Sequence, residues 1–127
     1  MDARIDVLRA LDVELGDAHV LRNAGAVVSD DVLRSLILSQ RFLGTRRVVV
    51  MGHTDCGAHG LDDIGLAGEL IAETGTAPAL GFGGFTDLDV HVRDQVRRVQ
   101  SCPWLPFTDD VSGCVYDVVD ASVRPVD

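Results

Sequence analysis

The stretch RRVVVMGHTDCG, residues 46–57, joins an apolar run to a short polar motif. The run is rich in valine and shows no polar alternation, which is typical of a parallel strand that is buried on both faces. His53 follows at the carboxyl end of this predicted strand. In open α/β sheets, ligands bind outside the carboxyl ends of the strands, where successive loops meet. The stretch therefore predicts a buried strand and a functional site at its end.

The residues before this stretch alternate between helical and extended patterns. Asp6 is placed to cap a short helix, and Gly16 is placed to end it. Residues 19–22 are predicted to form a short strand. The sequence NAGA, residues 23–26, is predicted to form a tight turn in which Gly25 permits unusual backbone angles.

The clearest helical pattern lies between this turn and the predicted strand. Ser29 precedes two aspartates and a series of apolar residues at helical spacing, and Gly44 is placed to close the helix. Extended and helical patterns thus alternate along this part of the chain.

Helical patterns return after the polar motif, at about residues 64–74 and 87–101. The Gly-rich sequence GTAPALGFGGF, residues 75–85, separates them and is predicted to be a flexible loop or a lid. Residues 112–126 are rich in β-forming residues and are expected to add an edge strand. This order predicts an α/β fold with a mostly parallel central sheet flanked by helices, in one domain spanning residues 1–127.

Composition excludes several classes of partner. The chain has 127 residues and a formal net charge of −9, which argues against nucleic acid and against anionic membrane surfaces. Its apolar runs are far shorter than the roughly 18 residues that span a bilayer. The three cysteines form no CxxC pair, and no leader pattern opens the sequence. A cytoplasmic location is therefore expected.

His53 and Cys56 are candidate metal ligands. Their spacing of three residues in a turn lets an imidazole nitrogen and a thiolate face one ion, and this pair of donors suits zinc. His59 extends the spacing and is a candidate third ligand. The alternative is a buried cysteine beside a hydrogen-bonded histidine, because two ligands do not complete a tetrahedral site.

The sequence MDARID, residues 1–6, places a carboxylate and a guanidinium two residues apart. Asp2 and Arg4 are expected to pair. Taken alone, such a pair is most simply a solvated surface ion pair without a catalytic role.

Taken together, MDARID, RNAGA and HTDCG occur in an order that resembles the β-class carbonic anhydrases. The likeness continues through SDDVLRSLILSQRFLGTRRVVVMGHTDCG. The resemblance implies a zinc enzyme for reversible hydration of carbon dioxide to bicarbonate, in which two cysteines and one histidine bind the metal. It assigns His53 and Cys56 as metal ligands. It also assigns Asp2 and Arg4 as the catalytic dyad, with Asp2 able to take the fourth metal position.

The resemblance implies further roles. Arg4 would hold Asp2 off the metal, Asp2 would accept a hydrogen bond from zinc-bound hydroxide, and Gly57 would allow close backbone approach and contact substrate. It implies a homodimer or higher oligomer, with the helix bearing Leu33, Leu36 and Ile37 near the subunit boundary.

The sequence also departs from the family pattern. The family's first ligating cysteine stands immediately before the position of Met1, and the strand leading to it precedes that cysteine. The expectation is therefore an N-terminally shortened anhydrase with a weakened zinc site. The alternatives are a catalytically silent relative with a structural or regulatory role, and a hydrolase of carbon disulfide or carbonyl sulfide. Cys102 and Cys114 are expected to pack in the core.

Two histidines and a glycine-rich sequence remain outside these motifs. His19 and His91 are expected to be surface or hydrogen-bonded core residues. The sequence GFGGF, residues 81–85, lacks the spacing of a phosphate-binding loop, so nucleotide binding is not expected.

Overall fold

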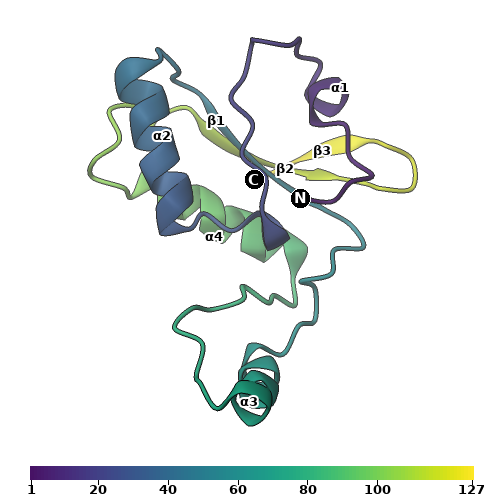
Figure 1. The fold of residues 1–127 in the computed structure, drawn as a ribbon. Coiled ribbons are helices and arrows are strands. Elements are labelled where there is room, and N and C mark those ends of the chain that lie inside the picture. The colour runs from purple at the N-terminus through teal and green to yellow at the C-terminus, as the bar shows by residue number, and fades with distance from the viewer.

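The computed structural model describes residues 1–127. Figure 1 shows three strands and their helices, together with an arm that projects from the rest of the molecule. In chain order the elements are α1 (Val7–Leu11), the short 3₁₀ helix η1 (Ala24–Ala26), α2 (Asp30–Phe42), β1 (Val48–His53), α3 (Asp63–Thr74), α4 (Leu88–Gln100), β2 (Val111–Tyr116) and β3 (Val123–Val126).

The strands form one sheet in the order β1-β2-β3. β1 and β2 are parallel, with Val48 opposite Val111 and His53 opposite Tyr116. β3 is antiparallel to β2 and forms the edge. The predicted α/β class and the parallel strand before His53 are confirmed, and the C-terminal segment supplies the middle strand as well as the expected edge strand.

One face of the sheet carries the core. Val48, Val50 and Val115 point to this face and belong to a buried cluster that α2 and α4 complete. α4 approaches closely because two glycines face it: a Cβ on Gly52 would lie 2.8 Å from Val92 Cγ2, and one on Gly113 would lie 2.7 Å from Val92 Cγ1. The seam between β1 and β2 therefore depends on the absence of side chains at these glycines.

The opposite face of β1 is less well covered. Val49 is 39% exposed, so the prediction of burial on both faces is wrong for this strand. The predicted strand at residues 19–22 is also not assigned as a strand. Its backbone is extended but has no strand beside it, because β1 pairs only with β2.

Helix ends follow their capping residues. Asp6 caps α1 by accepting the amide of Arg9, and Ser29 caps α2 by accepting the amide of Val32. α1 ends at Asp12, in a left-handed conformation with φ 52°, rather than at the predicted Gly16. Asp tolerates this conformation better than most residues, and its amide bonds the last carbonyls of the helix.

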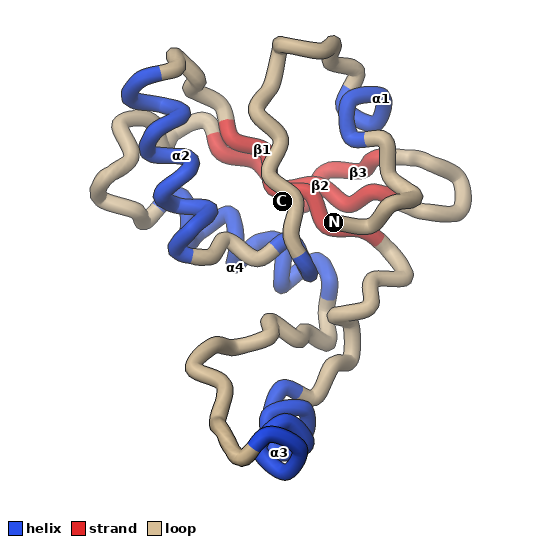
Figure 2. Tube along the Cα trace, viewed as in Figure 1, coloured by secondary structure: helices blue, strands red, loops and turns tan.

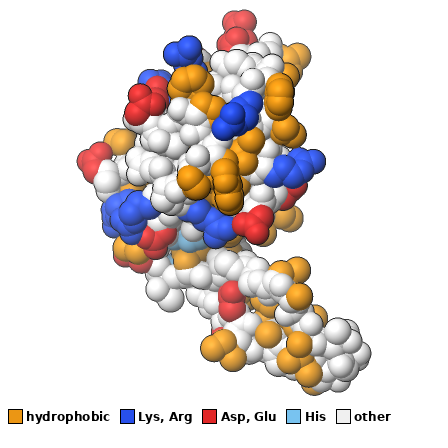
Figure 3. All heavy atoms as spheres, turned by 90° about the vertical axis from the view of Figure 1, so that its left-hand side faces the viewer, with side chains coloured by type: hydrophobic (Ala, Val, Ile, Leu, Met, Phe, Trp, Pro, Cys, Tyr) orange, Lys and Arg blue, Asp and Glu red, His pale blue; other side chains and the backbone are white.

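α3 and the Gly-rich segment after it form the projecting arm (Figures 1 and 2). Figure 3 shows hydrophobic side chains along the surface of this arm. Ile64, Ile71 and Leu80 belong to the arm and are exposed. The C-terminal part of the Gly-rich segment is held by hydrogen bonds. The carboxylate of Asp63 accepts the amides of Phe82, Gly83 and Gly84 at 2.8–3.1 Å.

None of the helices combines the length and the hydropathy that crossing a lipid bilayer requires.

Candidate functional site

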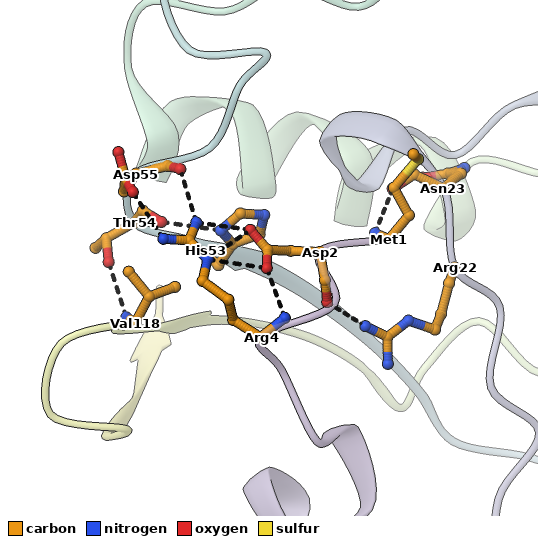
Figure 4. Close-up of polar contacts among 9 residues, drawn as sticks. All are labelled: Met1, Asp2, Arg4, Arg22, Asn23, His53, Thr54, Asp55 and Val118. Atoms are coloured by element: carbon orange, nitrogen blue, oxygen red, sulfur yellow. Dashed lines mark hydrogen bonds and ion pairs between the residues drawn. The ribbon is translucent and has the colours of Figure 1, made fainter.

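The polar motif lies at the carboxyl end of β1, as predicted. The amide of Thr54 continues the ladder by donating to the carbonyl of Tyr116, and the Thr54 hydroxyl accepts the amide of Val118 (Figure 4). His53 Nδ1 lies 2.9 Å from the carbonyl oxygen of Thr54. A carbonyl can only accept, so Nδ1 carries the proton and Nε2 is left as the nitrogen able to bind a metal or accept a proton.

His53 and Cys56 line the same small cavity. Its volume is about 180 Å³, and its other walls include His59, Phe85 and Leu88. Both His53 and Cys56 are half-buried. The cavity thus brings an imidazole and a thiol together beside an apolar wall, which agrees with the placement expected from their spacing.

Asp2 and Arg4 form the predicted pair, and they do so beside this motif (Figure 4). The Asp2 carboxylate accepts the backbone amide of Arg4 at 2.8 Å and Nη2 at 2.7 Å, with Nε within 3.1 Å of both oxygens. The side chain of Asp2 is only 18% exposed. The Arg4 side chain is 51% exposed, so the pair reaches the surface, but several bonds hold the carboxylate at once and make the pair more rigid than a single surface ion pair.

Two residues that the sequence analysis did not assign complete this arrangement. Arg4 Nη1 also donates to Asp55 at 2.8 Å, which ties the first motif to the loop after β1. Arg22 donates to the carbonyls of Asp2 and Ile5. Both signals were present in the quoted motifs, since Asp55 is the aspartate of HTDCG and Arg22 the arginine of RNAGA.

The electrostatics of the pair favour its charged form. Hydrogen bonds from the Arg4 side chain, and next from its backbone amide, hold the pKa of Asp2 far below its usual range. Hydrogen bonds to Asp2 and then to Asp55 raise the pKa of Arg4. Asp2 is therefore an ionised acceptor throughout the neutral range.

The donor set falls short of a complete zinc site. No three His, Cys, Asp or Glu side chains of the chain come together as a metal-binding group. His53 and Cys56 supply a nitrogen and a sulfur, but Asp2 is engaged by Arg4. Catalytic zinc is held by three protein ligands, so the 127 residues present do not fit the ion by themselves.

The other candidate ligands have different partners. His59 Nε2 lies 3.0 Å from the Thr86 carbonyl, and its ring stacks on Phe85. His91 is buried with Nε2 2.7 Å from the Gly25 carbonyl, while His19 is exposed beside Ser39. The predictions for His19 and His91 are confirmed.

The two remaining cysteines are structural. Cys102 and Cys114 are buried, as predicted, and burial raises the pKa of the Cys114 thiol.

Gly57 is exposed in the turn after Cys56. A Cβ built on it meets no atom within 4 Å. A side chain at this position would therefore point into open space. The three apolar residues of α2 that the resemblance places near a subunit boundary, Leu33, Leu36 and Ile37, are partly buried and pack against the chain's own core.

Comparison with known proteins places this site in a family. A sequence model described as "Carbonic anhydrase" matches residues 1–71. "Beta-carbonic anhydrase 1" of Mycobacterium tuberculosis is 41% identical over 126 residues, which cover 99% of this chain and 77% of that protein. A "Carbon disulfide hydrolase" of Acidithiobacillus thiooxidans is 32% identical over 145 residues, covering 98% of this chain and 73% of that protein.

Solved structures agree with the sequence comparisons. The crystal structure of carbonic anhydrase from Streptococcus mutans superimposes with a TM-score of 0.92 at 41% identity, covering all of this chain and 77% of that one. The apo form of a carbon disulfide hydrolase gives a TM-score of 0.88 at 27% identity, over all of this chain and 75% of that one. By its motifs, its fold and these similarities, the chain belongs to the β-carbonic anhydrase family.

Proposed function

We propose that this chain carries the catalytic half-site of an enzyme that hydrates carbon dioxide reversibly to bicarbonate. The observation that carries the proposal is the contact between two motifs distant in sequence. The Asp2–Arg4 pair of the first motif is bonded to Asp55, inside the motif that holds His53 and Cys56. This contact supports a shared role for Asp2, Arg4, His53 and Cys56, with Asp55 as the link between the two motifs.

The residues of the chain have distinct roles in this proposal. Asp2 is a permanent hydrogen-bond acceptor, and Arg4 fixes the direction of its two oxygens. The hydrogen bond from Nδ1 to the Thr54 carbonyl orients the His53 ring and keeps Nε2 available. Phe85 and Leu88 give the 180 Å³ cavity an apolar wall, which suits a small neutral molecule. Gly57 is proposed to contact substrate through its backbone.

Zinc is the proposed cofactor, with His53 and Cys56 as two of its ligands. Held by three protein ligands, with the fourth position open, the ion would supply an activated water at neutral pH. Asp2 is the remaining ligand candidate within the chain, but it reaches a metal only by giving up bonds to Arg4. We therefore propose that a further thiolate donor is needed for stoichiometric binding.

The test is zinc per chain, measured by elemental analysis. The protein of 127 residues is compared with a longer chain that begins with an apolar strand ending in cysteine immediately before Met1. We expect about one zinc only in the longer chain, together with acceleration of carbon dioxide hydration. Cys56→Ser in the longer chain is the matched control and should lose both. A longer chain that binds zinc but does not accelerate hydration would refute the proposed reaction.

A second candidate function is hydrolysis of carbon disulfide or carbonyl sulfide. It is favoured by the similarity to carbon disulfide hydrolases and by the apolar cavity wall. Parallel assays of the longer chain with the three small molecules separate the two reactions. A zinc-loaded chain that is inactive on all three would instead support a silent relative with a structural or regulatory role.

We also propose that the protein is a cytoplasmic homodimer or higher oligomer. The exposed apolar residues of the arm support self-association, and the three free thiols support a reducing compartment. Sedimentation at several concentrations tests the first statement. A monomer at all concentrations would contradict it.

A further inference from the structure

The segment that leaves the candidate site for the arm and the segment that returns from the arm lie side by side. They meet at a parallel bridge between His59 and Phe85 (Figure 2). The amide of Phe85 donates to the carbonyl of Ala58 at 3.2 Å, and the amide of Gly60 donates to the carbonyl of Phe85 at 2.7 Å. The backbone of Phe85 is therefore fixed to the segment that directly follows Cys56.

The side chain of Phe85 is held by two histidine rings. It stacks on His91 with ring centroids 4.3 Å apart and on His59 with ring centroids 5.6 Å apart. His91 is itself buried, and its Nε2 lies 2.7 Å from the carbonyl oxygen of Gly25. Phe85 also lines the 180 Å³ cavity of the candidate site. The position of its ring therefore sets one wall of that cavity.

A carboxylate of the arm holds the backbone just before Phe85. Asp63 is the first residue of α3, and its two oxygens accept three successive amides at 2.8–3.1 Å, those of Phe82, Gly83 and Gly84. These hydrogen bonds, that from Gly84 first, lower the pKa of the Asp63 carboxyl, so the group is ionised at neutral pH. Hydrogen bonds to an ionised acceptor are stronger than those between neutral groups, and three of them fix the course of this segment.

The Asp63 carboxylate is not needed to cap α3. Asp62 is the capping residue, and its carboxylate accepts the amides of Ile64 and Gly65. The partners of Asp63 instead lie 19–21 residues further along the chain. A Cβ on Gly84 would lie 2.6 Å from Asp63 Oδ1, so the absence of a side chain there allows the carboxylate to approach.

We propose that Asp63 is a positioning residue for the candidate site, and that Phe85, which it holds in place, determines which small molecules the cavity accepts. The bonded amides end directly before Phe85, so they fix the direction in which the chain enters the bridge to His59. A wall held in this way limits the size of the molecule that fits. The role of Phe85 in this selection rests on the proposed function, whereas its positioning by Asp63 does not.

The positioning is tested on the metal-free protein of 127 residues by alkylation of Cys56 with iodoacetamide. Cys56 is half-buried in the cavity, while Cys102 and Cys114 are buried and serve as internal references in the mass spectrum. The limiting rate at high pH, where the thiol is fully ionised, reports access to Cys56. We expect Asp63→Asn to raise this rate about fivefold, because an amide NH₂ then replaces one of the accepting oxygens.

The matched control for this measurement is Asp62→Asn on the neighbouring residue. Asn caps helices as well as Asp does, so the alkylation rate should stay within about twofold of the parent's. A rate in Asp63→Asn equal to the parent's would overturn the proposal. Equal acceleration in the two variants would also overturn it, because the effect would then come from α3 as a whole.

A double-mutant cycle tests whether Asp63 acts through Phe85. Phe85→Leu keeps an apolar side chain but removes the ring that stacks on the two histidines, so it should also expose Cys56. If Asp63 acts by holding this ring, Asp63→Asn should change the rate by less than about twofold once Phe85→Leu is present. Effects that multiply in full would show that the two residues act independently and would overturn the proposal.

The selection is tested in the zinc-loaded longer chain, by kcat/KM for carbon dioxide and for carbon disulfide together with zinc per chain. Carbon disulfide is the longer molecule, so Phe85→Leu should lower the ratio of the first kcat/KM to the second by about threefold or more. Zinc should stay at about one per chain, which a general loss of structure would not allow. Asp63→Glu keeps the carboxylate and should retain more of the parent's ratio than Asp63→Asn.

The two possible failures are distinguishable. An unchanged ratio in a zinc-loaded Phe85→Leu chain would overturn the role of Phe85 in selection. A parent chain that holds zinc but is inactive on both molecules would refute the proposed function and, with it, that selection. The alkylation rates of Cys56 would still decide whether Asp63 positions Phe85, since they require neither zinc nor turnover.

Discussion

The two edges of β1 differ in almost every respect, although the same six residues form both. Toward β2, the strand is paired along its length and lies against α4 through Gly52 and Gly113. Toward residues 18–23, its backbone groups have no partner and a 760 Å³ groove follows it. The paired edge and one packed face are thus enough to place His53, while the open edge has no strand beside it.

The largest expected effect on stability comes from disturbing the contact between α4 and the paired strands β1 and β2. Gly113→Ala introduces a Cβ that would lie 2.7 Å from Val92 Cγ1 and 3.2 Å from Val96 Cγ2. We expect it to lower the free energy of unfolding by about 1–3 kcal/mol, measured by urea denaturation. Gly68→Ala in α3 is the control, since nothing lies within 4 Å of its Cβ, and should not destabilise. A Gly113→Ala protein as stable as the parent would show that α4 moves away without cost.

The second-largest effect on stability is expected from acid, which should weaken the ion pair between Asp89 and Arg124. Hydrogen bonds from Arg124 on β3 lower the pKa of Asp89 on α4 below its ordinary value of 3.8. As the pH falls, the Asp89 carboxylate binds a proton more readily in the unfolded state than in the folded state. The contribution of the ion pair to the free energy of unfolding is therefore present above pH 3.8, and it is lost as the pH falls through the lower pKa of the folded state. It is worth at most about 1 kcal/mol, because both side chains are solvated. Urea midpoints at pH 6 and pH 3 should differ less in Asp89→Asn than in the parent.

A smaller effect on stability is expected from salt, which should weaken an exposed ion pair at the start of β1 and β2. Arg47 and Asp110 form an exposed ion pair at the start of the β1–β2 ladder, at 3.0 Å. We expect Arg47→Ala to cost about 0.2–1 kcal/mol in dilute buffer and less at high salt. Unfolding at two ionic strengths measures the difference. A cost that is the same at both would mean that the arginine acts through packing rather than charge.

The smallest effect is expected at the open edge. Val49→Lys puts a charge on a residue that is 39% exposed, and we expect it to change the free energy of unfolding by no more than about 0.5 kcal/mol. Charges on an exposed strand edge oppose edge-to-edge association, so light scattering at high concentration should fall. Val48→Lys is the contrasting variant, because Val48 is buried in the core. Similar stability of the two variants would contradict the difference in burial between the two faces of β1.

Local signals predicted most of the elements. The valine run before His53 predicted a parallel strand, and Ser29 with two aspartates predicted the start of α2. These signals are local because capping and burial act within a few residues. The strand predicted at residues 19–22 was wrong for a different reason. A strand needs a neighbour, and no local pattern states whether a neighbour is present.

The site was predictable in parts. The pairing of Asp2 with Arg4 and the placement of His53 and Cys56 followed from motifs. The link from Arg4 to Asp55 joins residues 51 positions apart, and only the folded chain brings them together. The tether of the Gly-rich segment by Asp63 was missed for the same reason, since glycines alone indicate freedom of the backbone and do not reveal what binds their amides.

The β1–β2 pairing also has a consequence for the rate of folding. Val48 and its partner Val111 are separated by α3, the arm and α4, so the parallel ladder closes a long loop before any of its hydrogen bonds can form. Contacts so distant in sequence make folding slow. The arm lies inside that loop, and its exposed apolar residues remain accessible to other chains while the loop closes. The order in which α4 and the arm fold therefore decides how long an incomplete sheet persists.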